Sequence, residues 1–232
     1  MCYTFFMRKF FEKYGIKISD KKIEKFEKYY QLLIEYNQKF NITAITEREE
    51  VIEKHFIDSL LNVDNVDGKT LIDIGSGGGF PAIPIRIFND DLTLVMVDST
   101  GKKCEFLRAV VDNLELTNTT VICGRAEELA KDQKYREQFD MCSARAVARL
   151  NTLCEYCMPF VKKGGKFIAY KGNAEEELIE AQNAIKVLGG KLEKVDNFSL
   201  SDATRQIITI RKVNNTPTLY PRGNGKERKK PL

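Results

Sequence analysis

The chain has 232 residues, of which 43% are apolar, and its 37 lysines and arginines against 33 aspartates and glutamates give a net charge of +4. This length and composition predict one or two domains with a sizeable core, and no apolar run approaches the roughly 18 residues that a membrane span needs. The N-terminus interrupts its aromatic residues with charges and has no small-residue cleavage site, so we expect a cytoplasmic protein without a membrane partner.

The positive charge is concentrated at the C-terminus. From Arg211 onward there are seven basic residues and one acid, whereas the preceding 210 residues carry two more acids than bases. A near-neutral body with a basic tail is typical of a globular domain that contacts a polyanion at one place.

Residues 1–67 have the pattern of amphipathic helices, which predicts an N-terminal helical extension packed on the core. Ser19 or Asp20 can cap a helix whose buried face recurs every three or four positions, at Ile23, Phe26, Tyr30, Leu33, Asn37 and Phe40. Thr46 and Glu49 have the spacing of a capping box, and a second amphipathic helix is predicted after them.

The hydrophobic period changes at Gly68. Short apolar runs then alternate with segments long enough for a helix, and these runs are TLIDIG (70–75), LTLVMVD (92–98), TTVIC (119–123), FDMCSAR (139–145) and GKFIAYKG (165–172). The alternation predicts an α/β domain over 68–213, a mostly parallel twisted sheet with helices on both faces. The last two runs, LEKVDNFSL and RQIITIRKV, have no long helix between them and predict a hairpin at the sheet edge. Residues 214–232 form a basic tail whose prolines and glycines disfavour regular structure.

Six cysteines in a chain without an export signal are expected to be free thiols. Cys154 and Cys157 have the spacing of a metal or redox pair, but they lie in an apolar stretch without a second pair or a nearby histidine. We favour two buried small residues on a helix.

A glycine cluster follows the first predicted strand, in the sequence Asp73-Ile74-Gly75-Ser76-Gly77-Gly78-Gly79-Phe80. Small residues at a turn from strand to helix let the backbone approach a ligand, which is typical of nucleotide-like ligands. The dinucleotide fingerprint G-x-G-x-x-G would need glycine in place of Phe80. The form D-x-G-x-G-x-G is the first motif of methyltransferases that use S-adenosylmethionine.

Asp98 ends the second predicted strand, 23 residues after Gly75. This is near the offset of about 20 residues at which an acidic side chain accepts hydrogen bonds from ribose hydroxyls. The glycine cluster and Asp98 together predict an adenosine-containing cofactor, and an ordinary tight turn with a helix-capping Asp98 is the alternative.

His55 is the only histidine, so a Ser-His-Asp arrangement or a multi-histidine metal site would depend on it alone, and we expect no metal. We favour a histidine hydrogen-bonded where the helical segment meets the sheet over a catalytic one. Methyl transfer to an aromatic nitrogen lone pair needs no deprotonation, only alignment of the reactants in a desolvated pocket.

Ordered segments along nearly the whole chain resemble the glucose-inhibited division protein B family of ribosomal RNA small-subunit methyltransferases, known as methyltransferase G. The segments are FNITAIT, HFIDSL, LIDIGSGGGFPAIPI, VDSTGKKCEFL, GRAEELA, SARAVARL, FVKKGGKFIAYKG and TPTLYPRGNGKERKKPL. Two positions depart from the family, because Ala82 stands where it often has glycine and Lys103 where it commonly has arginine.

The resemblance implies a Rossmann-like class I enzyme that transfers a methyl group from S-adenosylmethionine to N7 of one guanine in 16S ribosomal RNA. It further implies a cytoplasmic enzyme that acts on this RNA or on the small ribosomal subunit, and we expect a monomer. The cofactor contacts that it implies are Gly75, Gly77, Phe80, Asp98, Ser99, Thr100, Ala126, Glu127 and Arg145. Phe80 is expected to pack on the cofactor, Asp98 to hold its ribose, and Ala126 with Glu127 to meet its adenine. Arg145 is expected closest to the transfer site, where it positions a reactant and transfers no proton.

RNA contact is expected from two groups of basic residues, Lys162, Lys163 and Lys171 in the predicted domain and Arg222, Lys226, Arg228, Lys229 and Lys230 in the tail. A solvated basic face is the alternative. The N7 atom lies on an edge that a paired A-form helix hides in its narrow major groove, so the target guanine is expected in a loop or pulled out of the stack. Removal of residues 222–232 is expected to weaken RNA binding, with little effect on cofactor affinity.

Two other classes share some of these features. A nicotinamide-dependent oxidoreductase would use the same sheet but needs the third glycine of its fingerprint. A non-catalytic RNA-binding adaptor would keep the basic tail and would not need Asp98 or an intact glycine turn.

Overall fold

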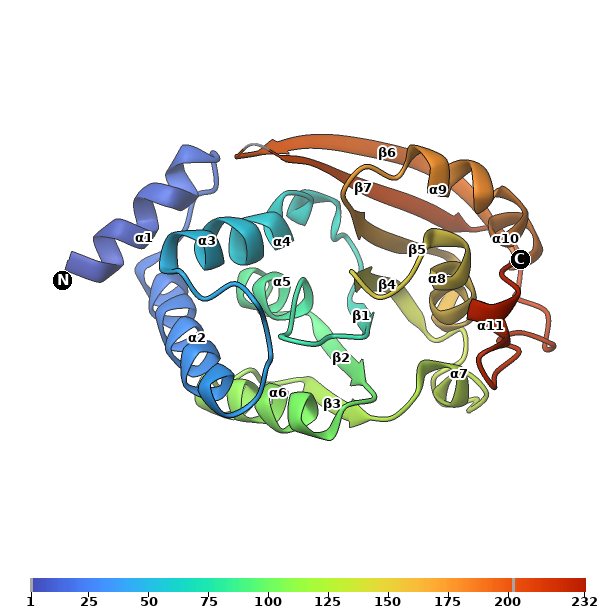
Figure 1. Cartoon of the computed structure of the whole chain (residues 1–232), viewed down its shortest axis with the longest axis horizontal. Coiled ribbons are helices and arrows are strands. Elements are labelled where there is room, and N and C mark those ends of the chain that lie inside the picture. The colour runs from blue at the N-terminus through green and yellow to red at the C-terminus, as the bar shows by residue number, and fades with distance from the viewer. Residues whose placement is uncertain (1, 202) are drawn as a thin grey trace.

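The structure is a computed structural model that describes residues 2–201 and 203–232, without the side chains of residues 2–4 and 65. Within this part of the chain, seven strands form one sheet in the order β3-β2-β1-β4-β5-β7-β6 (Figure 1). The strands are β1 (Thr70–Ile74), β2 (Thr93–Asp98), β3 (Thr119–Cys123), β4 (Phe139–Arg145), β5 (Val161–Lys171), β6 (Gly190–Leu200) and β7 (Ala203–Lys212).

The strand pairings confirm the predicted α/β fold. The five strands β1 to β5 are parallel, whereas β7 runs antiparallel to both β5 and β6, so the last two strands form the predicted edge hairpin. Because β1 to β5 run in the same direction, their C-terminal ends meet at one edge of the sheet, where open α/β sheets bind ligands.

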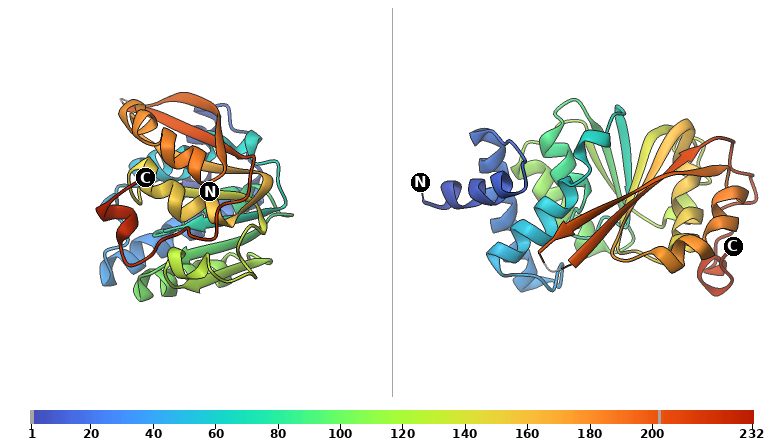
Figure 2. Two further views of the ribbon diagram at one scale, coloured as in Figure 1. Left: turned by 90° about the vertical axis from the view of Figure 1, so that its right-hand side faces the viewer. Right: turned by 90° about the horizontal axis from the view of Figure 1, so that it is seen from above.

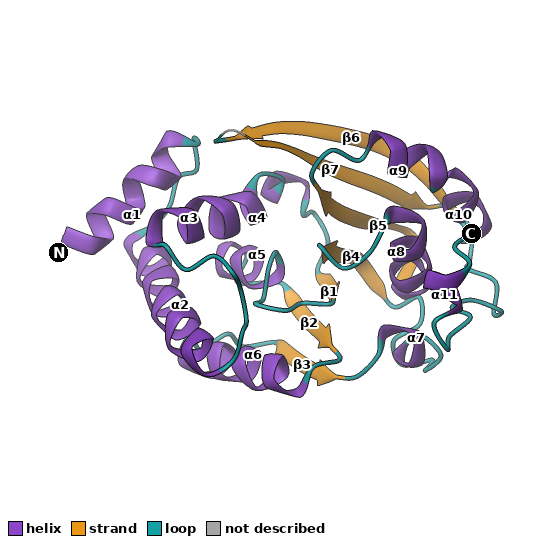
Figure 3. Cartoon of the chain, in the orientation of Figure 1, coloured by secondary structure: helices purple, strands orange, loops and turns teal. Residues whose placement is uncertain are grey.

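Helices cover both faces of this sheet (Figure 3). One group comprises α1 (Cys2–Lys13), α2 (Asp20–Lys39), α3 (Arg48–Val51), the π-helical turn η1 (Ile52–Ile57), α4 (Asp58–Leu60), η2 (Val63–Asn65), α5 (Ala82–Phe88) and α6 (Gly101–Asn113). The other comprises α7 (Ala126–Leu129), α8 (Leu150–Cys157), η3 (Met158–Phe160), α9 (Glu175–Glu180), α10 (Gln182–Val187) and α11 (Lys226–Lys229). The two ends of the chain lie at opposite ends of the molecule (Figure 2).

The core lies in two layers, because successive strand residues point to opposite faces of the sheet. Leu71, Leu94 and Met96 join the first layer with side chains from α1, α2, α5 and α6. Ile72, Val95 and Val97 join the second layer with side chains from α8 and α10. The N-terminal helices therefore share a core with one face of the sheet.

Two details of the N-terminal helices differ from the sequence prediction. The side chain of Ser19 caps α2 as predicted, but the buried aromatic residue is Tyr29, not Tyr30, because the residues that turn inward are Ile23, Phe26, Tyr29 and Leu33. The capping box is wrong, since the next helix begins at Arg48 after Glu47, which makes no side-chain cap.

Cys154 and Cys157 are buried free thiols on α8, as predicted. Cys104, Cys123 and Cys142 are also free, and Cys2 falls among the side chains outside the description. Among the described residues, none of the helices has the length and apolar character of a membrane span, and no three potential metal ligands lie together.

Candidate functional site

A pocket of about 410 Å³ lies at the C-terminal ends of β1, β2, β3 and β4. Six of the predicted cofactor residues line it, namely Gly75, Asp98, Ser99, Thr100, Ala126 and Glu127. They come from three separate loops, and the parallel strand order brings those loops together. The cofactor-binding role of each residue stays a prediction.

Two glycines of the turn have a backbone conformation that residues with a side chain rarely adopt. Gly75 has φ +70°, and a Cβ atom there would lie 2.6 Å from a methyl carbon of Val147. Gly79 has φ +86°, and a Cβ atom there would meet Ile83 at 2.4 Å and the Tyr29 hydroxyl at 2.6 Å. Side chains are therefore excluded at both positions, and the main chain forms this wall of the site.

The Asp98 carboxylate is held in one orientation by two backbone amides. Gly77 N donates to Oδ2 at 2.9 Å, and Thr100 N donates to Oδ1 at 2.8 Å. Gly77 does not line the pocket among the described residues, so its contact with the site is through Asp98. A carboxylate oxygen has further acceptor capacity beyond one amide, so Asp98 can still accept from a ligand hydroxyl.

Asp73 is a buried acid that we assigned no role from the sequence, although it opens the glycine motif. Its side chain is fully buried, Oδ1 accepts from the Ser143 hydroxyl at 2.6 Å, and Oδ2 has no partner in the described part of the chain. Burial raises the pKa of the Asp73 carboxyl to about 7, although the Ser143 hydrogen bond acts in the opposite direction. Asp73 therefore links β1 to β4 directly below the turn.

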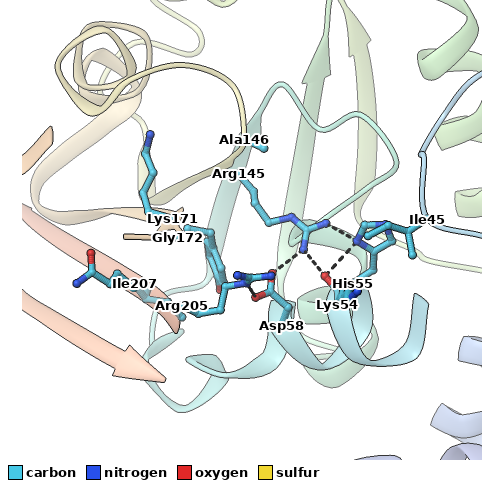
Figure 4. A pocket seen from close by; sticks show the side chains of 12 residues that line it. Ile45, Lys54, His55, Asp58, Arg145, Ala146, Lys171, Gly172, Arg205 and Ile207 are labelled. Atoms are coloured by element: carbon cyan, nitrogen blue, oxygen red, sulfur yellow. Dashed lines mark hydrogen bonds and ion pairs between the residues drawn. The ribbon is translucent and has the colours of Figure 1, made fainter. Parts of the chain in front are cut away.

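A second pocket, of about 320 Å³, lies beside the first and shares Ala146 with it (Figure 4). Arg145 lines this second pocket and is absent from the described lining of the first. Ile45, from the segment between α2 and α3, also lines it. The N-terminal region therefore contributes to this pocket as well as covering the sheet.

The Arg145 guanidinium is fixed by groups from distant parts of the sequence. It donates to Asp58 Oδ2 at 2.7 Å and to the Lys54 carbonyl at 3.2 Å, and it lies 3.0 Å from His55 Nδ1. Asp58 also accepts from Arg205 of β7 at 2.9 Å, so one buried carboxylate holds two arginines. Figure 4 shows Arg145 reaching across the pocket toward the helical segment that carries His55 and Asp58. Neither Asp58 nor Arg205 was among the predicted site residues.

His55 is hydrogen-bonded where the helical segment meets the sheet, as we favoured from the sequence. His55 Nδ1 lies 3.0 Å from an Arg145 nitrogen, which can only donate, and 3.1 Å from the Lys54 carbonyl oxygen, which can only accept, while Nε2 lies 2.9 Å from the Thr43 hydroxyl. Burial, and to a smaller extent the positive charge of Arg145, lower the pKa of His55 to about 3, although the hydrogen bond with the Lys54 backbone acts in the opposite direction. A neutral imidazole with both nitrogens in use is suited to fixing Arg145.

Phe80 is absent from the described lining of both pockets. Its ring stacks on His55 at 4.4 Å between centroids and on Tyr29 at 5.3 Å, and the Arg145 guanidinium lies 5.0 Å from its centre. The Phe80 ring therefore packs against both the Arg145 guanidinium and the His55 ring that contacts it. Its predicted contact with the cofactor stays a prediction.

The glycine turn is also braced by the N-terminal helices. The buried hydroxyl of Tyr29, on α2, donates to the carbonyl of Gly78. The signal for Tyr29 in the sequence was only its place in an amphipathic helix, which does not reveal a partner 49 residues away.

The predicted RNA-binding residues do not form one surface. Lys162 and Lys163 are exposed at the start of β5, the end of the strand away from the pockets, and Lys162 pairs with Asp140. Lys171 lies at the other end of β5, where its ammonium group donates to Glu177 and to the Ala148 carbonyl. Their contact with RNA stays a prediction.

The predicted RNA-binding residues of the tail differ in how exposed their side chains are. Arg222 pairs with Glu155 of α8, whereas Lys226, Lys229 and Lys230 are exposed. Three basic residues line the first pocket, namely Lys103, Arg125 and the tail residue Arg228.

Comparison with known proteins gives a consistent result. A family model described as GidB, rRNA small subunit methyltransferase G, matches residues 22–208. The ribosomal RNA small subunit methyltransferase G of Lachnoclostridium phytofermentans is 50% identical over 224 residues, which cover 94% of this chain and 93% of that protein. The protein of the same name from Lactobacillus acidophilus is 46% identical and covers 95% of each chain.

Solved structures with the same fold include an O-methyltransferase from Bacillus cereus in complex with SAH. Its TM-score is 0.57 at 14% identity, over 80% of this chain and 91% of that one. A 16S rRNA (adenine(1408)-N(1))-methyltransferase variant from Catenulisporales acidiphilia has a TM-score of 0.54 at 13% identity, over 69% and 92% of the two chains. These structures confirm the Rossmann-like methyltransferase fold. The oxidoreductase and adaptor alternatives are not favoured, and the chain belongs to the rRNA small subunit methyltransferase G (GidB) family.

Proposed function

We propose that this chain transfers a methyl group from S-adenosylmethionine to N7 of a guanine in 16S ribosomal RNA. The observation that carries the proposal is that six of the nine predicted cofactor residues, from three loops, line one pocket at the sheet edge. The proposed substrate is the RNA or the small ribosomal subunit, and the proposed form is a cytoplasmic monomer.

The lining of the first pocket suits the chemical groups of this cofactor. Ribose hydroxyls are donors, and Asp98 presents an acceptor already oriented by Gly77 and Thr100. The small Ala126 side chain leaves room for a flat ring, and Glu127 can accept from an exocyclic amino group. When bound, S-adenosylmethionine supplies an activated methyl group.

The acceptor base is proposed to enter the second pocket, whose lining meets that of the first at Ala146. Arg145 presents an oriented positive charge there, and Asp58 and His55 prevent it from turning away. A planar guanidinium can stack on a purine or donate to its carbonyl oxygen. Because the N7 lone pair is free at neutral pH, the residues of this pocket need only orient the base and exclude water.

The test is mass mapping of 7-methylguanine after incubation of the protein with S-adenosylmethionine and either 16S RNA or small subunits. We expect one new 7-methylguanine, and we expect Asp98→Ala to lose both the product and S-adenosylmethionine binding by calorimetry. Unchanged cofactor binding by Asp98→Ala would contradict the ribose role. Methylation of neither substrate, or of another base atom, would contradict the proposed reaction.

A further inference from the structure

The C-terminal segment, which we define as residues 214–232, forms part of the wall of the cofactor pocket. Gly225 and Arg228 line the pocket together with Tyr156 of α8 and with Ala126 and Glu127 of α7. Helix α11 packs on α8, which also packs on α7, and Figure 1 shows these three helices gathered at one end of the sheet. The segment was expected from the sequence to serve RNA alone.

The first half of the C-terminal segment is held by a single arginine from the loop before β4. Arg136 donates to the carbonyls of Thr216 at 2.9 Å, Pro217 at 3.2 Å and Tyr220 at 2.9 Å. Glu137 adds to this anchor, since its carboxylate accepts from Thr216 N at 2.7 Å. These bonds give the segment a fixed path toward α8.

The second half is held by two buried carboxylates. Glu155 has no exposed surface and accepts from the backbone and side chain of Arg222, at 2.8 Å from N and 2.6 Å from one terminal nitrogen. Glu227 is equally buried, accepts from Gly223 N, and its own carbonyl accepts from the Thr152 hydroxyl at 3.0 Å. A buried carboxylate without a partner is strongly unfavourable, so these contacts fix the chain immediately before Arg228.

Arg228 projects from this fixed point to the mouth of the pocket. Its side chain is exposed, and it interacts with Tyr156, which lines the same pocket. Arg228 lines the same pocket as Ala126 and Glu127 of α7, which are proposed to meet the adenine. A guanidinium is planar and cationic, so it can lie on the face of a purine or donate to its ring nitrogens.

We infer that Arg228 is a cofactor-binding residue that contacts the adenine part of S-adenosylmethionine, and that the docked C-terminal segment completes the pocket. This inference rests on the proposed function for the identity of the ligand. It also predicts that removal of residues 222–232 weakens cofactor binding as well as RNA binding.

The test uses calorimetry of the full-length protein with two ligands, S-adenosylhomocysteine and 5′-methylthioadenosine, which lacks the amino acid portion. We expect Arg228→Ala to weaken both by the same factor of about ten, the size of a moderate guanidinium contact with an aromatic ring. Arg108→Gln, which removes an exposed arginine of α6 outside the pocket lining, should leave both affinities unchanged.

Each result decides a separate point. Unchanged binding of both ligands by Arg228→Ala would overturn the inference while leaving the proposed function intact. Weaker binding of S-adenosylhomocysteine with unchanged 5′-methylthioadenosine would overturn the adenine contact, because the loss would then arise at the carboxylate end. If the parent protein bound neither ligand, the proposed function and the inference would both be wrong.

Discussion

The single histidine gives a direct test of the network that holds Arg145. His55 is 9% exposed, and it lies between the Arg145 guanidinium and the Thr43 hydroxyl with Phe80 against its face. A protonated imidazole would place a second positive charge about 3 Å from the Arg145 guanidinium, in a buried position. The ring is therefore expected to stay neutral throughout the physiological range.

The size of the effect follows from the pKa of about 3, compared with 6.5 for a free histidine. A difference of this size corresponds to about 5 kcal/mol between the two protonation states. The unfolded chain takes up the proton below pH 6.5 and the folded chain does not. This contribution to the free energy of unfolding is therefore complete above pH 6.5 and is lost as the pH falls toward 3.

The perturbation is Arg145→Gln, and the assay is an NMR titration of the His55 imidazole between about pH 5 and pH 8. The parent resonance should not shift over this range. Arg145→Gln removes the neighbouring charge but not the burial, which is the larger cause, so the pKa should rise and stay below 6.5. The control Arg108→Gln, which changes an exposed residue of α6 that does not contribute to the pKa of His55, should behave as the parent. A parent midpoint near 6.5 would refute the reasoning.

Three further predictions follow from single contacts. The folded state retains the Asp73 proton up to about pH 7, so the free energy of unfolding falls as the pH rises from 3.8 to that value. Asp73→Asn removes this loss, and in urea unfolding its free energy of unfolding should increase relative to the parent by about 1.4 kcal/mol per pH unit over this range. A difference that does not change with pH would contradict this prediction. Tyr29→Phe leaves the Gly78 carbonyl without its partner and should cost about 1–3 kcal/mol of stability and weaken cofactor binding; an unchanged calorimetric affinity would show that the glycine turn needs no brace. Replacing Lys229 and Lys230 with glutamine should reduce the slope of log affinity for RNA against log salt by about 1.4, and an unchanged slope would exclude them as phosphate contacts.

The fold could be predicted because it depends on local periodicity. The strand runs, their spacing and the closing hairpin all follow from alternation of apolar segments, and the parallel order then brings the ends of β1, β2 and β3 together. The glycine turn and Asp98 were recognisable because their chemistry requires glycine at a positive φ and an acid at a strand end. Local periodicity also gave one error, because it predicted that Tyr30 is buried and the buried residue is Tyr29. Neighbouring residues on a helix point about 100° apart, so a shift of one position changes the face.

The rest of the site depends on contacts between distant residues, which no local pattern records. Arg145 is 87 residues from Asp58, and Asp58 is 147 residues from Arg205. In the same way, the position of Arg228 depends on the ion pair between Arg222 and Glu155, which lies 67 residues earlier in the chain. An isolated charged residue in the sequence does not indicate whether its partner is water, RNA or a buried carboxylate.

The charge at the C-terminus illustrates this limit. Of the seven basic residues after position 210, four make contacts within the protein, namely Arg211 with Glu193, Lys212 with Glu137, Arg222 with Glu155 and Arg228 with Tyr156. The exposed lysines of the C-terminal segment, Lys226, Lys229 and Lys230, carry only part of the charge that the sequence suggested for RNA. They lie on or next to the short helix that also carries Arg228. Phosphate contacts there would place the RNA backbone at the mouth of the cofactor pocket. The tail would then orient the RNA at the site more than it would attract the RNA from a distance.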